Sequence, residues 1–391
     1  MFWGLPQHLL WQSPHLLKRR QYFMDKPTST SAQVRLRLER YIRTFAGIVI
    51  GVFLLWRVYN VIVLQHNFGA DTWVRFGLAG LILGGMYALI AIGYTLVYGI
   101  MFMINFAHGE VMMLGAFSGF FTFEALRFIH APTLANPELN FLNAHPFVSV
   151  LLAFLVGISV SATTGYFLER IAYRPLRKAP RLILLITAIG ASIFLQNLAM
   201  LLFGPQRKNV VNPDILDRGA GWILKVSGND VLISYTGIFS LVLSTLLMIG
   251  LYNLVQRTKL GRAMRAVASD RNTASLMGVD VDSVISKTFM ISGALAGAAG
   301  VMWDIHMGLV NHYTGFLPGI KAFTAAVMGG IGNIPGAMLG GMLLGVIEAI
   351  GPAALGIDFQ LKDVIAFSIL VLVLIVRPSG ILGEKLSEEK L

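Results

Sequence analysis

The feature that most constrains this chain is a series of apolar segments, each about 20 residues long, with almost no charged side chains. One of them, GLAGLILGGMYALIAIGYTLVYGIMF, runs from residue 77 to residue 102 without an Asp, Glu, Lys or Arg. A helix of about 20 such residues crosses the ~30 Å hydrocarbon core of a bilayer. Charged residues make up only 13% of the chain, against roughly a quarter in soluble domains. The sequence therefore predicts an all-α polytopic membrane protein.

The apolar segments divide into full spans and one segment of a different kind. About eight full transmembrane helices are predicted, at 44–64, 77–98, 108–126, 147–168, 182–203, 235–255, 286–305 and 363–377. The segment 322–350 is too long for one ordinary span, and its middle reads GGIGNIPGAMLGG. Because proline cannot donate a backbone hydrogen bond and glycine weakens helices, we expect a re-entrant hairpin of half-helices at 322–332 and 336–350. The residues expected at this break are Gly332, Asn333, Pro335 and Gly336.

The distribution of basic residues predicts how the chain lies in the membrane. The loop 169–181 holds five basic residues and one acid, and the loop 256–285 holds five basic residues against three Asp. Lys and Arg are enriched in cytoplasmic loops, so both loops should be cytoplasmic, and 127–146 and 204–234 should face outward. Orientation in the membrane also explains the net charge of +11 better than binding to nucleic acid would.

Four regions follow from this topology. Residues 1–43 form a basic N-terminal extension that we expect in the cytoplasm, followed by a transmembrane helix at 44–64. Residues 75–385 form one membrane domain, and 386–391 form a short cytoplasmic tail. Glycines repeat every fourth residue in 293–300 and 332–345, a spacing that lets membrane helices approach closely, and we expect this packing within the chain rather than between copies.

The sequence lacks the motifs of several kinds of catalytic, metal or nucleotide site. The chain has no cysteine, no GxxxxGK[ST] phosphate loop, no HExxH and no GxSxG. We therefore predict no catalytic residue, no metal site and no cofactor bound by this chain. A membrane hydrolase with a dispersed active site stays open as an alternative.

Polar residues inside the apolar segments are the first candidates for function. The stretch MINFAHGEVMMLG at 103–115 places an asparagine, a histidine and a glutamate between two predicted spans. Polar groups in a membrane are costly and usually face a partner or a water-filled cavity. They therefore either pin helices together or line a transport path. The candidates are Asn105, His108, Glu110, Gln196, Asn197, Asp304, His306 and Glu348.

Several separate stretches resemble one family, the permease subunits of high-affinity branched-chain amino acid ABC importers, the LivH-like permeases. The motifs that carry the resemblance are NFAHGE, ERIAYRPLR, SIFLQN and GGIGNIPGAMLGG, and the match extends from about residue 75 to 385. The extra span at 44–64 departs from the family pattern. The resemblance implies the fold of the broader permease superfamily, with half-helices near the pathway.

The resemblance also implies partners and a location. These would be a homologous second permease, two cytoplasmic ATPase subunits that use ATP, and a periplasmic substrate-binding protein, at a bacterial inner membrane with the N-terminus in the cytoplasm. The loop 256–285 would be the element that couples to an ATPase subunit. Its glycine at 278 is the residue type that ends helices, and Asp282 or Ser283 is expected to cap the next helix. The coupling candidates are Arg262, Arg265, Ala274, Ser275, Leu276, Met277 and Gly278.

Three other functions stay open on the sequence alone. A permease for urea or short amides would share these motifs. A stand-alone secondary transporter or channel would move its solute without ATPase subunits, and a membrane anchor would transport nothing. The TASLMG stretch at 273–278 favours amino acids as the substrate class.

Overall fold

The computed structural model describes residues 68–130, 140–177 and 179–383, together with 47, 49, 51–53 and 56–61. The chain divides into two units, 1–56 and 57–391, and the second unit contains the membrane bundle. The predicted basic extension 1–43 and the predicted tail 386–391 lie outside the described residues. The predicted span 44–64 lies partly outside them, and the residues of it that are described are helical.

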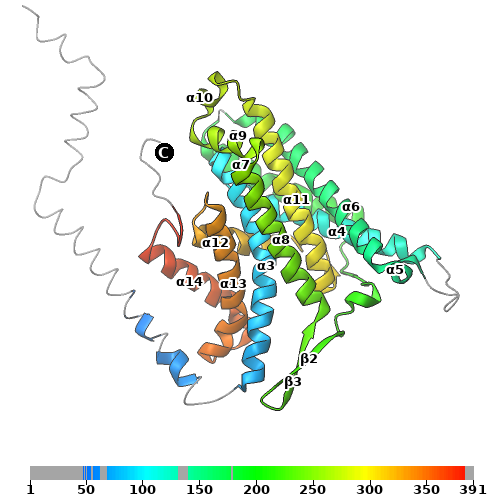
Figure 1. Ribbon diagram of the computed structural model, residues 1–391. Coiled ribbons are helices and arrows are strands. Elements are labelled where there is room, and N and C mark those ends of the chain that lie inside the picture. The colour runs from blue at the N-terminus through cyan, green and yellow to red at the C-terminus, as the bar shows by residue number, and fades with distance from the viewer. Residues whose placement is uncertain are drawn as a thin grey trace, which may run out of the picture. The chain divides into compact units, whose positions relative to one another are not determined.

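The prediction of an all-α membrane protein is confirmed (Figure 1). Within the described ranges, eight helices are long and apolar enough to cross a membrane. They are α3 (Ala70–Met101), α4 (His108–Phe128), α6 (Pro146–Phe167) with its continuation η2 (Leu168–Tyr173) and η3 (Arg174–Leu176), α7 (Arg181–Phe203), α8 (Tyr235–Arg257), α11 (Val281–Met307), α13 (Ile334–Leu355) and α14 (Lys362–Val376), which η5 (Phe359–Leu361) precedes.

Shorter elements connect these helices. They are α5 (Phe141–Ala144), β1 (Lys208–Asn209), η4 (Asp214–Leu216), β2 (Gly221–Val226), β3 (Asn229–Ser234), α9 (Lys259–Ser269), α10 (Arg271–Leu276), β4 (Leu309–Val310) and α12 (Phe316–Gly329). Strands β2 and β3 form an antiparallel hairpin in which Trp222 pairs with Ile233, and β1 pairs with β4. Figure 1 places α10 and the β2–β3 hairpin at opposite ends of the bundle, and we call these the α10 end and the hairpin end.

Contacts between loops confirm the predicted grouping into two sides. At the α10 end, Arg177 after η3 contacts Asp282 at the start of α11, which joins the two basic loops. At the hairpin end, the backbone N–H of Asp214 donates to the Asn143 side chain, which joins the two loops predicted on the other side. The loops with excess Lys and Arg therefore share one end.

The segment 322–350 forms the predicted hairpin, in which the first arm, α12, is a short helix of 14 residues and the second arm is longer than predicted. The chain turns at 330–333, where Gly330 and Gly332 have positive φ, and α13 is a full-length helix of 22 residues. Pro335 lies in the first turn of α13, where its missing N–H breaks no helical bond, and Asn333 caps that helix. The turn packs on residues 381–383 at the α10 end, so the break does not lie at membrane depth.

The helices are instead interrupted at depth in two other places, 102–107 and 311–315. The His108 ring at the start of α4 lies against Gly93, about two turns before the end of α3. Gly109 packs directly on Gly315 and Gly319 at the start of α12. The N-termini of α4 and α12 therefore meet inside the apolar bundle, where protein covers the non-helical backbone.

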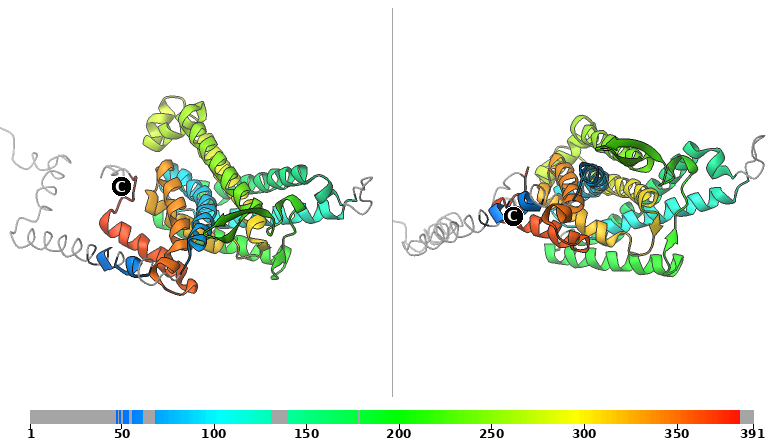
Figure 2. Two further views of the ribbon diagram at one scale, coloured as in Figure 1. Left: turned by 60° about the horizontal axis from the view of Figure 1, so that its bottom comes forward. Right: turned by 90° about the horizontal axis from the view of Figure 1, so that it is seen from below.

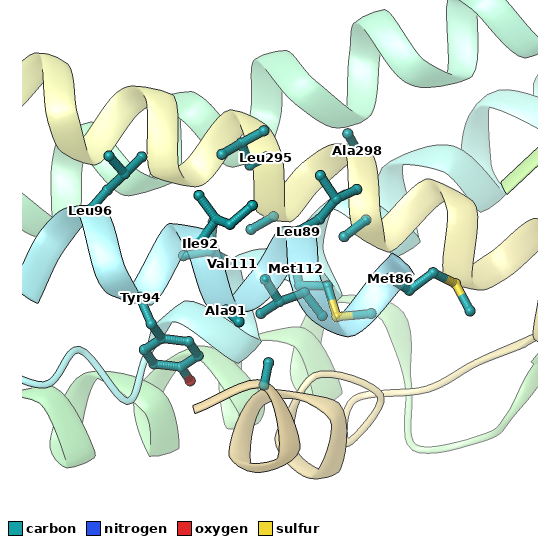
Figure 3. Close-up of a cluster of buried hydrophobic side chains, with 14 of the residues drawn as sticks. Met86, Leu89, Ala91, Ile92, Tyr94, Leu96, Val111, Met112, Leu295 and Ala298 are labelled. Carbon is teal, nitrogen blue, oxygen red and sulfur yellow. The ribbon is translucent and has the colours of Figure 1, made fainter. Parts of the chain in front are cut away.

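Helix α3 is the centre of the bundle. Figure 2 (right) shows it nearly end-on between α13 and α11, and it contacts both. Figure 3 shows the buried side chains that join α3 to α4 and α11, including Met86, Ile92, Met112 and Leu295. The α3–α13 contact is close because Gly341 lies on the Ala88 backbone. Apart from Gly332, which has no neighbour within 4 Å, the glycines of both repeats pack within the chain as predicted.

We predict that Gly341→Ala destabilises the protein by about 1–3 kcal/mol, because the added Cβ would overlap the Ala88 backbone and overpack the α3–α13 contact. Thermal unfolding in detergent measures the effect. Gly250→Ala in α8 is the matched control, since nothing lies within 4 Å of the Cβ it would add. Equal unfolding temperatures for the two variants would contradict the packing argument.

Candidate substrate cavity and docking loop

A cavity of about 240 Å³ lies where the N-termini of α4 and α12 meet. Residues of α7 form part of its lining, and so does Tyr94 of α3. This volume is below the ~300–1,000 Å³ of pockets for drug-sized ligands and suits a small solute. The lining residues are Tyr94, Phe106, Gly109, Glu110, Ile189, Ser192, Ile193, Gln196, Gly315, Phe316, Gly319 and Ile320.

Glu110 is the acidic residue of this cavity, and only 1% of its surface is exposed. Its Oε1 accepts a hydrogen bond of 2.7 Å from the Gln196 side chain and one of 3.3 Å from the Ser192 hydroxyl. Its Oε2 has no hydrogen-bond partner. Over the ranges that the structure describes, no Lys, Arg or His forms an ion pair with this carboxylate. Glu110 therefore has acceptor capacity that the protein leaves unused.

The other predicted polar candidates near the break do not share this position. Asn105 accepts a 2.6 Å hydrogen bond from the Tyr173 hydroxyl and is buried, so it joins the 102–107 segment to η2. His108 is buried with Nδ1 3.4 Å from the Ser292 hydroxyl and its ring edge-on to Tyr94. These contacts hold α3, α4 and α11 together, as expected of groups that pin helices.

The pair Gln196 and Asn197 is divided between two faces of α7. Gln196 lines the cavity and donates to Glu110, whereas Asn197 is exposed and donates to the Ile193 carbonyl of its own helix. Gly332, Asn333 and Pro335 line a different cleft, of about 530 Å³, at the α10 end. Gly336 packs on Gly329. None of these four residues near the turn borders the Glu110 cavity.

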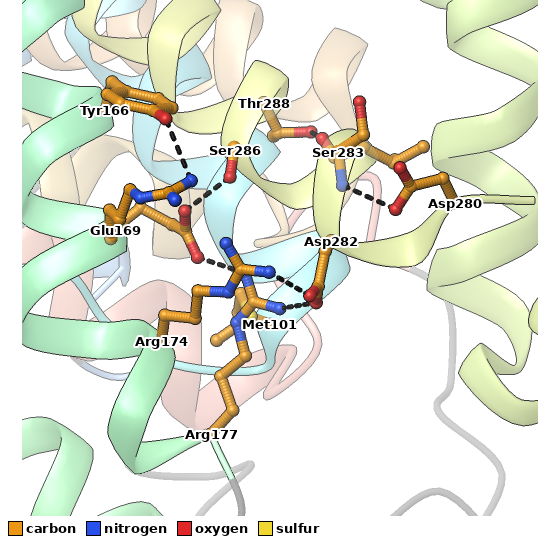
Figure 4. A network of polar contacts seen from close by, with 12 residues as sticks. Met101, Tyr166, Glu169, Arg174, Arg177, Asp280, Asp282, Ser283, Ser286 and Thr288 are labelled. Atoms are coloured by element: carbon orange, nitrogen blue, oxygen red, sulfur yellow. Dashed lines mark hydrogen bonds and ion pairs between the residues drawn. The ribbon is translucent and has the colours of Figure 1, made fainter.

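The ERIAYRPLR segment builds a polar network that sequence reasoning did not foresee (Figure 4). The buried carboxylate of Glu169 accepts from Arg177 and, at 2.5 Å, from the Ser286 hydroxyl of α11. Arg174 and Arg177 both bind Asp282. The predicted cap at Asp282 or Ser283 is wrong, because α11 begins at Val281 and Asp280 caps it by accepting from the Ser283 N–H.

A second charged cluster ties α12 to three neighbouring helices. Lys321 of α12 is buried and binds Glu348 of α13 at 2.8 Å and Asp363 of α14 at 2.6 Å. Lys362 and the Tyr87 hydroxyl also bind Glu348. Two lysines therefore balance two carboxylates. Glu348 was a sequence candidate, and the lysine inside the apolar stretch GIKAFTAAV was the signal for its partner.

The loop between α8 and α11 presents two apolar side chains at the α10 end. Leu276 is 87% exposed and Met277 is 80% exposed. Ala274 is buried and Gly278 has φ +83°, which confirms the predicted helix end at this glycine. Arg262 and Ser275 are exposed, and Arg265 donates to the Val255 carbonyl at the end of α8. The predicted coupling residues thus form a short helical hairpin with an exposed apolar tip.

Two hydrogen-bond arrangements fix α10 in place. The Thr273 hydroxyl and the N–H groups of Thr273 and Asn272 donate to Asp270, and these bonds lower the pKa of that carboxyl. Arg271 donates to the Ile100 carbonyl at the end of α3. Burial lowers the pKa of the Arg271 guanidinium, and the nearby Arg177 lowers it further. The loop is therefore anchored to the helix that forms the bundle centre.

The spanning helices of the described residues define a multi-pass membrane protein, with a small cavity at a double helix break and an exposed loop at one end. Residues 77–374 match the family model for the permease component of branched-chain amino acid transport systems. The chain belongs to this family, and the family prediction from its motifs is confirmed.

Curated relatives cover most of this chain. The high-affinity branched-chain amino acid transport system permease protein BraD of Pseudomonas aeruginosa is 49% identical over 304 residues, 78% of this chain and 94% of BraD. The permease protein LivH of Escherichia coli is 44% identical over 305 residues, 78% of this chain and 93% of LivH. A probable LivH of Methanocaldococcus jannaschii is 30% identical, covering 78% of this chain and 90% of that protein. No solved structure shows significant similarity to this chain.

We predict that Glu169→Ala destabilises the protein by about 3 kcal/mol, the low end for removing one partner of a buried ion pair, because Arg177 keeps its contact with Asp282. Chemical unfolding in detergent measures the difference. Glu124→Ala removes a more exposed ion pair with Arg127, which is worth about 0–1 kcal/mol. The network would have no structural role if the two variants unfolded alike.

Proposed function

We propose that this chain is a permease subunit of an ATP-driven importer and that it forms, with a homologous second permease, the path for leucine, isoleucine and valine. The observation that carries the proposal is the family match over 77–374, with relatives that are named as branched-chain amino acid permeases along nearly their whole length. Two ATPase subunits would use ATP, and a periplasmic binding protein would deliver the amino acid. This chain itself would bind no cofactor and catalyse no reaction.

The membrane would be the inner membrane of a bacterium, with the α10 end in the cytoplasm. The positive loops at 169–181 and 256–285 share that end and support this orientation. With the predicted span at 44–64, the basic segment 1–43 would lie on the same side. The hairpin end would then face the binding protein.

The α9–α10 loop would dock on an ATPase subunit. Exposed large apolar side chains next to each other, such as Leu276 and Met277, fit a hydrophobic groove on a partner. Anchoring through Arg271 to α3 gives the loop a rigid connection to the transport path. Arg262, Arg265, Ala274, Ser275 and Gly278 would shape this contact.

Uptake by the reconstituted importer tests the proposal. We predict that proteoliposomes holding this chain with its second permease and ATPase subunits take up L-leucine when the binding protein and ATP are supplied. Omitting the ATPase subunits should abolish uptake, and uptake that persists would favour a secondary transporter. Uptake of urea in place of leucine would favour the permease for short amides.

We predict that the double substitution of Leu276 and Met277 by serine abolishes stable binding of the ATPase subunits without lowering the stability of the permease, because both side chains are already exposed. Co-purification of the ATPase subunits measures binding. Ile223→Ser is the matched control, since that side chain is 65% exposed on the hairpin at the opposite end. Normal co-purification of the double variant would place the ATPase contact elsewhere.

A further inference from the structure

We propose that the cavity between α4, α7 and α12 is a binding site for a translocating α-amino acid, and that Glu110 Oε2 accepts the ammonium group while the apolar wall receives the aliphatic side chain. This inference rests on the proposed transport function. It adds which residues of this chain touch the substrate and which part of the substrate each one recognises.

The charge of the cavity is the first argument. Glu110 is buried, and an ionised carboxylate in such a place is costly unless a cation pairs with it. No cationic side chain supplies that charge in the described residues, although the chain pairs Glu169 and Glu348 with Arg and Lys. Glu110 lines the cavity, and its Oε2 is buried without a hydrogen-bond partner. A bound ammonium group would satisfy both its charge and its hydrogen-bonding capacity.

The walls of the cavity are the second argument. Apart from the polar groups at one side, the lining consists mainly of Phe106, Ile189, Ile193, Phe316 and Ile320. These side chains offer no charge and suit an aliphatic group of a few carbons. One polar anchor beside an apolar wall is the pattern that a leucine-like zwitterion requires.

The two helix starts are the third argument. Neither Ala107 before α4 nor Gly315 before α12 caps its helix with a side-chain hydrogen bond. Helix N-termini carry partial positive charge and favour anions. With Glu110 on the ammonium group, the α12 start would face the substrate carboxylate, as at the broken helices of other transporters.

Gln196 is a positioning residue in this arrangement. Its side chain donates to Oε1 of Glu110 at 2.7 Å, and Oε2 has no hydrogen-bond partner. Ser192, one helical turn earlier on α7, donates to the same oxygen. The two bonds fix the carboxylate against α7 without neutralising it.

The test is Glu110→Gln in the complete importer with its ATPase subunits and binding protein, and the probe is L-leucine. The glutamine carbonyl still accepts the hydrogen bond from Gln196, but it cannot balance an ammonium charge. We expect the initial rate of leucine uptake to fall about tenfold or more, because hydrogen bonds to charged groups are worth about 1.5–3 kcal/mol. Assembly and ATP hydrolysis stimulated by the binding protein should remain.

Two further variants separate a binding role from a structural one. Asn197→Ala, beside Gln196 but exposed and turned away, should leave uptake unchanged. Glu110→Asp keeps the charge and should retain more uptake than Glu110→Gln. Normal uptake by Glu110→Gln would overturn the inference, and so would an equal loss of assembly in both Glu110 variants. A wild-type importer that takes up no leucine would instead refute the proposed function itself.

Discussion

The structure depends on one constraint, that hydrocarbon offers no water to hydrogen-bond with exposed backbone. Two segments, 102–107 and 311–315, leave helical conformation inside the bundle, and the protein covers them where glycines at the starts of α4 and α12 pack together. Gly109 lies directly on Gly315 and Gly319 with no side chain between the backbones. This contact joins two helix starts that are more than 200 residues apart in the sequence. The Glu110 cavity is lined by residues of both helix starts.

The same constraint explains why buried charges occur in balanced groups. Glu348 and Asp363 meet two lysines, and Glu169 meets Arg177, which also binds Asp282. Each group joins helices by polar contacts. Apolar contacts alone hold membrane helices together less strongly, because lipid tails are as apolar as the side chains. Two buried carboxylates differ: Glu110 accepts hydrogen bonds only from the neutral Gln196 and Ser192, and Asp304 has no hydrogen-bond partner.

Much of the fold could be predicted because helices in a membrane follow apolar length and loop charge. The spans, the grouping of the basic loops and the helix end at Gly278 followed from local patterns. The depth of the turn at 330–333 did not, because Pro335 signals a helix start as readily as a helix interruption, and only the partner surface at 381–383 decides between them. Helical spacing places Gln196 on the same face of α7 as Ser192 and Asn197 on another, but the cavity that Gln196 lines requires α4 and α12 in place.

The π-helical turn η2 has a consequence for how this family can change. The wider turn brings Glu169, Tyr173 and Arg177, spaced by four residues, onto partners in α11 and in the 102–107 segment. Removing one residue from Leu168–Tyr173 would rotate every later side chain by about 100° relative to those partners. A substitution in this segment would therefore remove one contact, whereas an insertion or deletion would displace all of its later contacts at once.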